Sequence, residues 1–192
     1  MNPVVKLLGS LVLALGIANA SEHVLDDSHT SVGFSVKHLM ITNVKGEFKE
    51  FDANIDFDYK TKVFKVFKAT VKTKSVNTGI VKRDNHLRSE DFFLSQKYPE
   101  MSFDMKSYES DDEDGKMKGN LTIRGVTKPV TLEVEDIGTI KDFEGNNRVG
   151  FTLKGKINRL DFGLKWNKAL EFGGFAVGDK VKITIEVEAV EL

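Results

Sequence analysis

The 192-residue chain has no cysteine, and this absence alone excludes several kinds of protein. Without cysteine there is no disulfide framework, no thiolate metal site and no cysteine nucleophile. An excess of charge of one sign is also missing, because 28 lysines and arginines face 29 acidic residues, for a formal net charge of −1. Nucleic-acid-binding proteins need a concentrated basic surface, so we expect no nucleic acid partner.

Motifs of catalysis and metal binding are missing as well. The chain has no Gly-x-Ser-x-Gly elbow, no His-Glu-x-x-His helix and no glycine-rich phosphate loop after a strand. The four histidines, which have no partners at metal-ligand spacing, are His23, His29, His38 and His86. The acidic run from Asp111 to Gly115 lacks the alternating carboxylates of a calcium loop and suits a solvated turn. We therefore expect no enzyme activity, no metal and no cofactor.

Only one apolar run is long, and it lies at the beginning of the chain. Residues 1–20 carry a single charge, Lys6, before an apolar stretch that ends in Ala18-Asn19-Ala20. This small-x-small ending predicts a signal peptide cleaved after Ala20, and the stretch is too short for a comfortable membrane span. The mature chain, residues 21–192, is then exported. Its length suffices for a single domain with its own core.

Alternation of apolar and polar residues with a period of two dominates the mature chain and predicts strands. The clearest hairpin reads MKGNLTIRGVTKPVTLEV, residues 117–134. Its pattern predicts a four-residue loop, Arg124 to Thr127, with Leu121 opposite Val130.

The alternation changes phase at Lys49-Glu50 and again between Val66 and Phe67, and each change predicts a β-bulge. One segment, Gly79 to Ser89, has the spacing of a helix of about three turns. Roughly eight or nine strands with one inserted helix and no helical crossovers predict an all-β fold. The expected architecture is a single extended, lipocalin-like antiparallel β-barrel.

A barrel of about eight strands is wide enough to hold one small ligand. The glycines on the predicted inner face, Gly46, Gly119 and Gly155, either leave a channel or merely mark bends in the strands, and both interpretations are open. A channel would have hydrocarbon-like walls suited to a long apolar chain, and phenylalanine at Gly119 or Gly155 would block it in a barrel that still folds. The residues expected to contact the chain are Phe34, Val36, His38, Phe48, Phe103, Met105, Leu121, Leu132, Phe151, Leu153, Phe162 and Trp166.

Several motifs along the chain resemble those of the YceI-like proteins. They are residues 28–39 (SHTSVGFSVKHL), 44–48 (VKGEF), 83–88 (RDNHLR), 97–99 (KYP), 121–130 (LTIRGVTKPV) and 158–163 (NRLDFG). The resemblance runs in order over essentially the whole mature chain. It implies a lipocalin-like barrel, exported to the periplasm, whose bore holds a polyisoprenoid, an isoprenoid quinone or a similar long-chain lipid. Residues 161–178 depart from the family pattern in being richer in aromatics, which concerns the shape of the mouth.

Polar residues near the expected mouth are candidates for contact with a lipid head group. Those that could hold a phosphate or a quinone oxygen are Arg83, Arg88 and Asn158. The alternative is a salt-bridged helix that closes the barrel end, in which Asp84 holds backbone groups. His38 either meets the head group or bonds to a neighbouring loop. The aromatic residues that either cover the ligand as a lid or pack a loop are Phe162, Trp166 and Phe172.

These observations predict a periplasmic protein that binds, transports or stores a long-chain amphiphile. It does not span the membrane but contacts it transiently. One alternative is a barrel with a packed interior that acts through its surface as a partner-binding or stress-response protein. Another is a hydrolase or isomerase of lipid head groups with His38 or His86 as the base. A homodimer is also open.

Overall fold

The structure is a computed structural model that describes residues 22–111, 114–171 and 173–192. The predicted signal peptide, residues 1–20, and Phe172 of the predicted lid lie outside the described residues. Across the described ranges, no helix has the length and apolar character needed to cross a membrane.

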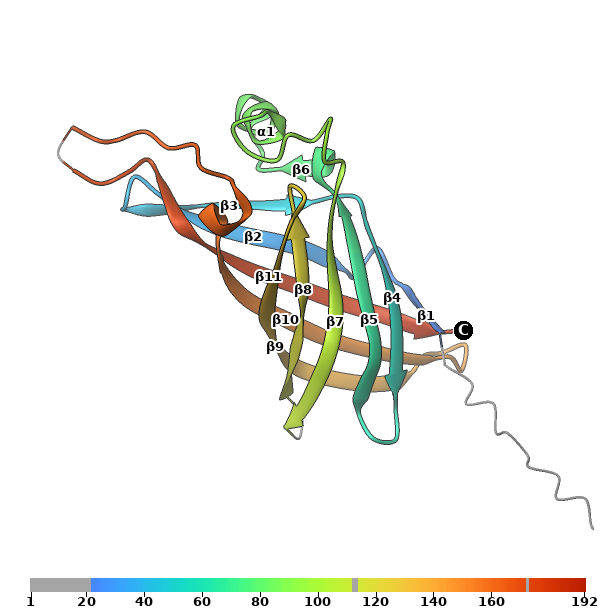
Figure 1. The fold of residues 1–192 in the computed structure, drawn as a ribbon. Helices are drawn as coiled ribbons and strands as arrows, with labels where there is room; N and C mark the ends of the chain where they lie inside the picture. Colours follow the sequence, from blue (N-terminus) through green and yellow to red (C-terminus); the bar gives the residue numbers. More distant parts are fainter. Residues whose placement is uncertain (1–21, 112–113, 172) are drawn as a thin grey trace, which may run out of the picture.

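The strands form one antiparallel sheet that closes on itself (Figure 1). They are β1 (Glu22–Leu25), β2 (Ser31–His38), β3 (Thr42–Phe48), β4 (Phe51–Asp58), β5 (Val63–Lys72), β6 (Val76–Asn77), β7 (Glu100–Asp111), β8 (Asp114–Ile123), β9 (Val126–Lys141), β10 (Asn147–Asn158) and β11 (Val177–Glu191). Both β1 and β2 pair with β11, so together they form one long barrel strand, and β3 with β4 forms the next. The short β6 lies outside the closed ring. This arrangement is an eight-stranded barrel, as the sequence predicted.

The helical elements gather at one end of the barrel. They are the 3-10 turns η1 (Thr73–Ser75) and η2 (Arg159–Phe162) and the helix α1 (Val81–Arg88). One α-helix among the described residues confirms the prediction, although at eight residues it is shorter than the predicted three turns. In Figure 1, α1 stands above the open end of the barrel, and the β2–β3 turn projects beside the loop between η2 and β11.

The predicted register of the β8–β9 hairpin is wrong by two residues. Met117 pairs with Leu132 and Gly119 pairs with Val130, so the connection is a two-residue turn, Arg124-Gly125. Both turn residues have positive φ, 52° and 74°. This is the turn geometry that matches the right-handed twist of the flanking strands, which explains why the shorter loop forms. A shift of two keeps every side chain on its predicted face.

The two predicted bulges have different outcomes. At Lys49-Glu50 the strand stops, so the predicted bulge there is wrong. The backbone N–H groups of Lys49 and Glu50 donate to the Ser75 hydroxyl, at 3.2 and 3.0 Å, instead of to a neighbouring strand. In β5 the register shifts at Lys65, within two residues of the predicted position, which confirms that bulge.

Half of the barrel, away from α1, is filled by a packed core. Its aromatic rings contact one another, with centroid distances of 4.8 Å for Phe57 and Phe64 and 4.7 Å for Phe64 and Phe151. Gly119 and Gly155 do not leave empty space: an added Cβ would lie 2.5 Å from the Phe103 ring at Gly119 and 2.5 Å from Leu132 at Gly155. The interpretation that these glycines open a channel through this half is therefore wrong. They make room for the neighbouring side chains.

Arg148 joins carboxylates at the packed end of the barrel. It lies 2.9 Å from Asp142, 3.0 Å from Asp26 and 2.8 Å from Glu188. The hydrogen bond from the Arg148 guanidinium lowers the pKa of Asp142 to about 2. In the unfolded chain the pKa of an aspartate is about 3.9.

These pKa values predict acid sensitivity. Because the folded state favours ionised Asp142, its contribution to stability is present above the unfolded pKa of about 4 and is lost as pH falls through the folded pKa of about 2. We expect the free energy of unfolding, measured in urea, to fall over this interval. In the Asp142→Asn variant the fall should be shallower. An equally steep fall in the variant would assign the acid sensitivity to other carboxyls.

Candidate functional site

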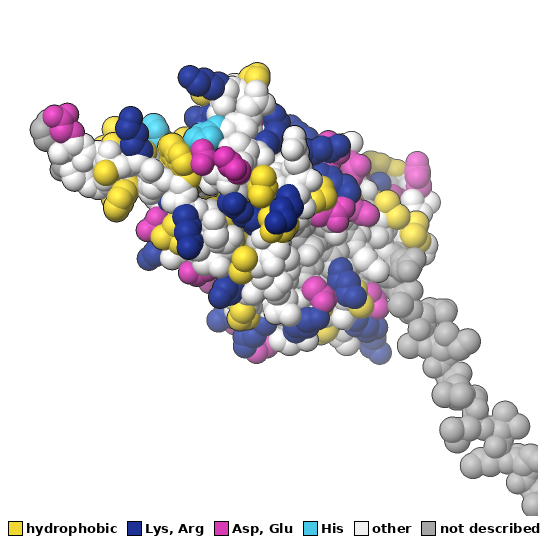
Figure 2. Space-filling model, turned by 45° about the horizontal axis from the view of Figure 1, so that its top comes forward, with side chains coloured by type: hydrophobic (Ala, Val, Ile, Leu, Met, Phe, Trp, Pro, Cys, Tyr) yellow, Lys and Arg dark blue, Asp and Glu magenta, His cyan; other side chains and the backbone are white. Residues whose placement is uncertain are grey.

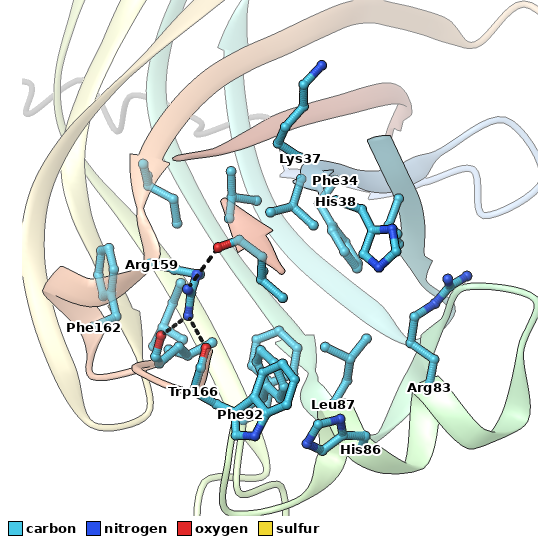
Figure 3. A pocket seen from close by; sticks show the side chains of 18 of the residues that line it. Phe34, Lys37, His38, Arg83, His86, Leu87, Phe92, Arg159, Phe162 and Trp166 are labelled. Atoms are coloured by element: carbon cyan, nitrogen blue, oxygen red, sulfur yellow. Dashed lines mark hydrogen bonds between the residues drawn. The ribbon is translucent and has the colours of Figure 1, made fainter. Parts of the chain in front are cut away.

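The opposite half of the barrel, beneath α1, contains a cavity of about 300 Å³ (Figure 3). Its walls come from β2, β3, β7, β8, β10 and β11, from α1 with the segment that follows it, and from η2 with its following loop. The lining residues are Phe34, Val36, Lys37, His38, Val44, Phe48, Arg83, His86, Leu87, Phe92, Phe93, Met101, Ile123, Ile157, Arg159, Phe162, Leu164, Trp166, Ala176, Val177 and Val181. These side chains are mostly hydrocarbon or aromatic, and none carries a carboxylate or hydroxyl group.

Helix α1 is fixed over the cavity by side chains that bond to the backbone. Arg88 donates to the carbonyl oxygens of Lys74 (2.7 Å) and Val76 (2.8 Å). Asp84, which is buried, accepts from the backbone N–H and the hydroxyl of Thr78, at 2.8 and 2.6 Å. Arg88 therefore acts as an anchor of the helix, not as part of the cavity wall. The predicted alternative for Asp84, holding backbone groups, is the one observed.

Arg83 lies at the opening of the cavity. Its Nε and Nη2 donate to Thr78, to the hydroxyl at 2.7 Å and to the carbonyl oxygen at 2.9 Å. No described residue accepts a hydrogen bond from its Nη1. Figure 3 shows Arg83 and His38 on the same side of the opening. The opening thus presents a cation and an imidazole above walls that are otherwise apolar.

Three aromatic residues form the wall beside α1. The His86 ring meets Trp166 edge to face with centroids 4.7 Å apart, and it meets Phe92 in the same way at 5.0 Å. His86 Nε2 lies 2.8 Å from the Asp91 carboxylate, which fixes the orientation of the ring. Because Trp166 comes from the loop after η2, this contact joins the loop to the helix along one wall of the cavity.

The loop between η2 and β11 is organised by a buried cation. Arg159 is only 3% exposed, and burial lowers the pKa of its guanidinium. It donates to the carbonyl oxygens of Trp166 at 2.9 Å and Gly178 at 2.9 Å, and also to that of Leu164. Asp179 lies 3.4 Å away as a partly exposed counter-ion. One side chain therefore holds both ends of this loop.

The predicted contact residues fall into two groups. Those that line the cavity are Phe34, Val36, His38, Phe48, Phe162, Trp166 and Arg83. Those that lie outside it are Phe103, Met105, Leu121, Leu132, Phe151, Leu153, Arg88 and Asn158. The side chain of Asn158 accepts from the backbone N–H of Leu160 at 3.0 Å and caps η2, so its role is structural. The apolar members of the second group belong to the packed half or contact it.

Sequence reasoning did not place several lining residues. Phe92, Phe93 and Leu164 come from irregular segments, where alternation gives no indication of direction. Arg159 was considered from the sequence only as part of a cationic group near the mouth, and its bonds to carbonyl oxygens could not be predicted, because every residue carries such an oxygen. In the sequence, the clearest indication of a role for Arg159 is its position just before the aromatic-rich segment 161–178.

One group of described residues has the proximity of metal ligands. Asp26, His29 and Glu188 lie close together at the packed end, far from the cavity. Arg148 already contacts both carboxylates and offsets part of their charge.

An antiparallel barrel with one apolar chamber, open at one end, defines a class of small-ligand-binding barrels. The chain belongs to the YceI family, because the model of the YceI-like domain matches residues 23–189. It is 38% identical to "Protein YceI" of Escherichia coli O17:K52:H18 over 184 residues, covering 95% of this chain and 93% of that protein. It is also 38% identical over 166 residues to "UPF0312 protein SA2479" of Staphylococcus aureus, covering 85% and 94%.

Solved structures have the same fold. The Campylobacter jejuni YCEI protein is 47% identical, with a TM-score of 0.73, over 88% of this chain and 96% of that chain. A polyisoprenoid binding domain from Saccharophagus degradans is 14% identical, with a TM-score of 0.66, over 90% and 99%. The second likeness concerns the fold alone.

Proposed function

We propose that this protein binds the tail of a long-chain amphiphile, such as a polyisoprenoid or an isoprenoid quinone, in the chamber beneath α1. The observation that carries the proposal is a largely apolar cavity of about 300 Å³, in which Arg83 lies at the opening and the buried guanidinium of Arg159 is bonded to carbonyl oxygens. Burial of apolar surface contributes about 0.8 kcal/mol per methylene, so a tail of modest length gives tight binding. The description of the Saccharophagus degradans neighbour as a polyisoprenoid binding domain supports this ligand class.

Binding without chemistry is the role that the lining favours. Among the described residues that line the cavity there is no serine, threonine, cysteine, aspartate or glutamate to act as a nucleophile. His86, a candidate base from the sequence, is held by Asp91 and two aromatic rings. The polar end of the ligand then rests at the opening, where Arg83 Nη1 can donate to a phosphate or carbonyl oxygen.

The opening also suits brief contact with a membrane during loading in the periplasm. Exposed apolar residues project beside it: Met40 is 58%, Ile41 80% and Phe175 55% exposed. Hydrophobic side chains with nearby lysines and arginines are visible at this projecting end (Figure 2). Leu39 and Met40 hold positive φ values of 48° and 63°, a conformation that costs stability for such side chains. An apolar tip kept at this cost supports an interaction with lipid.

Ligand binding is tested by filling the chamber. Val181 lines the cavity on β11, and its neighbour Lys182 faces solvent on the same strand. We expect Val181→Trp to weaken binding of a long-chain alcohol or quinone by more than about tenfold, because the indole occupies the space of several methylenes. Lys182→Trp should bind as the wild type does. Native mass spectrometry of the exported protein, followed by organic extraction, measures both the load and its identity.

The packed-barrel alternative predicts a different outcome. If the wild type carries no lipid and takes up none of the added long-chain compounds, the chamber is not a lipid site, and the function lies on the outer surface. Equal binding by the two tryptophan variants, both folded, would place the lipid outside this cavity.

A further inference from the structure

The chamber ends abruptly halfway down the barrel. Met101, Ile123 and Ile157 line it on β7, β8 and β10. Two residues further toward the packed end, the inward positions on these strands are Phe103, Leu121 and Gly155, and none of them lines the cavity. The boundary between the hollow and the filled half therefore falls between two successive inward layers.

Two side chains belong to both halves at this boundary. Leu121 and Val130, on the paired strands β8 and β9, contact both the aromatic cluster around Phe92 and Phe162 and the large packed core. Leu121 and Val130 therefore separate the two halves: one side of each residue contacts the cluster around Phe92 and Phe162, and the other side contacts the packed core. We call the layer that contains them the partition.

Glycines fix the other members of the partition. The Phe103 ring lies over Gly119, where an added Cβ would be 2.5 Å from its Cζ. The Leu132 side chain lies over Gly155, where the corresponding distance to its Cδ2 is 2.5 Å. Phe103 is 6% and Leu132 4% exposed. By removing two side chains from the layer, the glycines let these larger residues extend across the barrel interior.

Beneath the partition there is no room for a chain. The Phe67 ring lies 6.1 Å from Phe103 and 6.0 Å from Phe151, and Phe151 lies 4.7 Å from Phe64, centroid to centroid. Packing at this density leaves few voids larger than a water molecule. A tail that enters from the opening meets this layer and stops.

We propose that Phe103, Leu121, Val130 and Leu132, the layer directly below the residues that line the chamber, close it from below as its floor and set the length of tail that the protein encloses. The proposal rests on the proposed function and makes it more specific. The affinity rises with tail length until the tail reaches the floor, and a longer tail leaves its excess at the opening, in water, with no further gain. The length of tail that is enclosed is thus set by the fixed depth of the chamber, whereas Arg83 contacts the polar end of the ligand.

A homologous series of saturated fatty acids tests the floor by titration calorimetry. For the wild type, each added methylene should raise the affinity about fourfold until the tail reaches the floor, after which the affinity stays constant. In Leu132→Ala the chamber deepens, so the plateau should begin about two to three methylenes later, corresponding to the carbons removed. Phe103→Leu should move it in the same direction, and it serves as a milder variant if Leu132→Ala does not fold.

Leu153→Ala is the matched control. Leu153 is fully buried in the packed half, one inward layer below Gly155, so its removal creates a closed void under the floor. It should lower stability as much as Leu132→Ala and leave the plateau in place. A plateau that stays at the wild-type length in folded Leu132→Ala and Phe103→Leu overturns the floor, as does a wild-type affinity that rises through the whole series. Absence of binding at every length overturns the proposed function as well.

Discussion

Replacement of Arg159 with leucine is expected to lower the free energy of unfolding by about 3 kcal/mol or more. The guanidinium bonds to carbonyl oxygens at both ends of the loop between η2 and β11. Each buried acceptor left without a donor costs about 1–3 kcal/mol, and leucine supplies no donor. Because Trp166 is carried by this loop and packs against His86, the chamber wall should loosen with it. Urea unfolding measures the free energy of unfolding, and lipid titration measures whether the looser wall lowers the affinity for lipid.

Asp179→Asn provides the comparison for this change. Asp179 is half exposed and lies 3.4 Å from Arg159, so its removal should cost less than about 1 kcal/mol. If the two variants were equally stable, the ion pair and not the carbonyl contacts would be the source of the stability. If Arg159→Leu matched the wild type, the loop would have another anchor.

Gly119→Ala is expected to destabilise the barrel by about 1–3 kcal/mol, as overpacking of a filled core does. The new Cβ would lie 2.5 Å from the Phe103 ring and 2.6 Å from the carbonyl oxygen of Asp104. The ring can turn, but the carbonyl belongs to the paired strand and moves only with the backbone. Phenylalanine at this position, which sequence reasoning expected a folded barrel to accept, should prevent folding.

Gly138→Ala is the control for Gly119→Ala, because it also replaces a strand glycine but creates no clash. An added Cβ at Gly138 meets no atom within 4 Å. This variant should be as stable as the wild type or more stable by about 0.5 kcal/mol, because alanine restricts the unfolded chain. Thermal and urea unfolding should therefore show a loss of stability for Gly119→Ala and none for Gly138→Ala. Similar losses in both would show that the Phe103 contact is unimportant.

The barrel itself was predictable because alternation with a period of two reports which face of a strand is buried. The hairpin of β8 and β9 shows the limit of that signal. A shift of two residues leaves every face unchanged, so alternation could not distinguish the two-residue turn at Arg124-Gly125 from a four-residue loop. The choice depends on turn geometry, because the two-residue turn requires positive φ at both positions. Gly125 adopts such a φ readily, but a positive φ at Arg124 is hard to predict from sequence.

The candidate site was predictable only in part, for a related reason. Phe34, Val36 and Phe48, which continue the inward pattern of strands, line the cavity. Phe103, Leu132 and Phe151 follow the same pattern, yet they fill the barrel instead of lining a cavity. The difference depends on whether the facing residue is large or small, which involves pairs from distant strands. A single sequence does not identify these pairs.

Because one half of the barrel is filled and the other is hollow, backbone amides in the two halves should differ in their protection against hydrogen exchange with solvent. Ile55, Val149 and Leu153 are completely buried, so amides of β4 and β10 around them should exchange hydrogen only when the whole barrel unfolds. Helix α1, in contrast, is connected to the barrel through β6, which pairs over two residues, and through a few side-chain hydrogen bonds. We therefore expect amides of α1 to exchange faster than those of the packed half, through local opening that leaves the barrel folded.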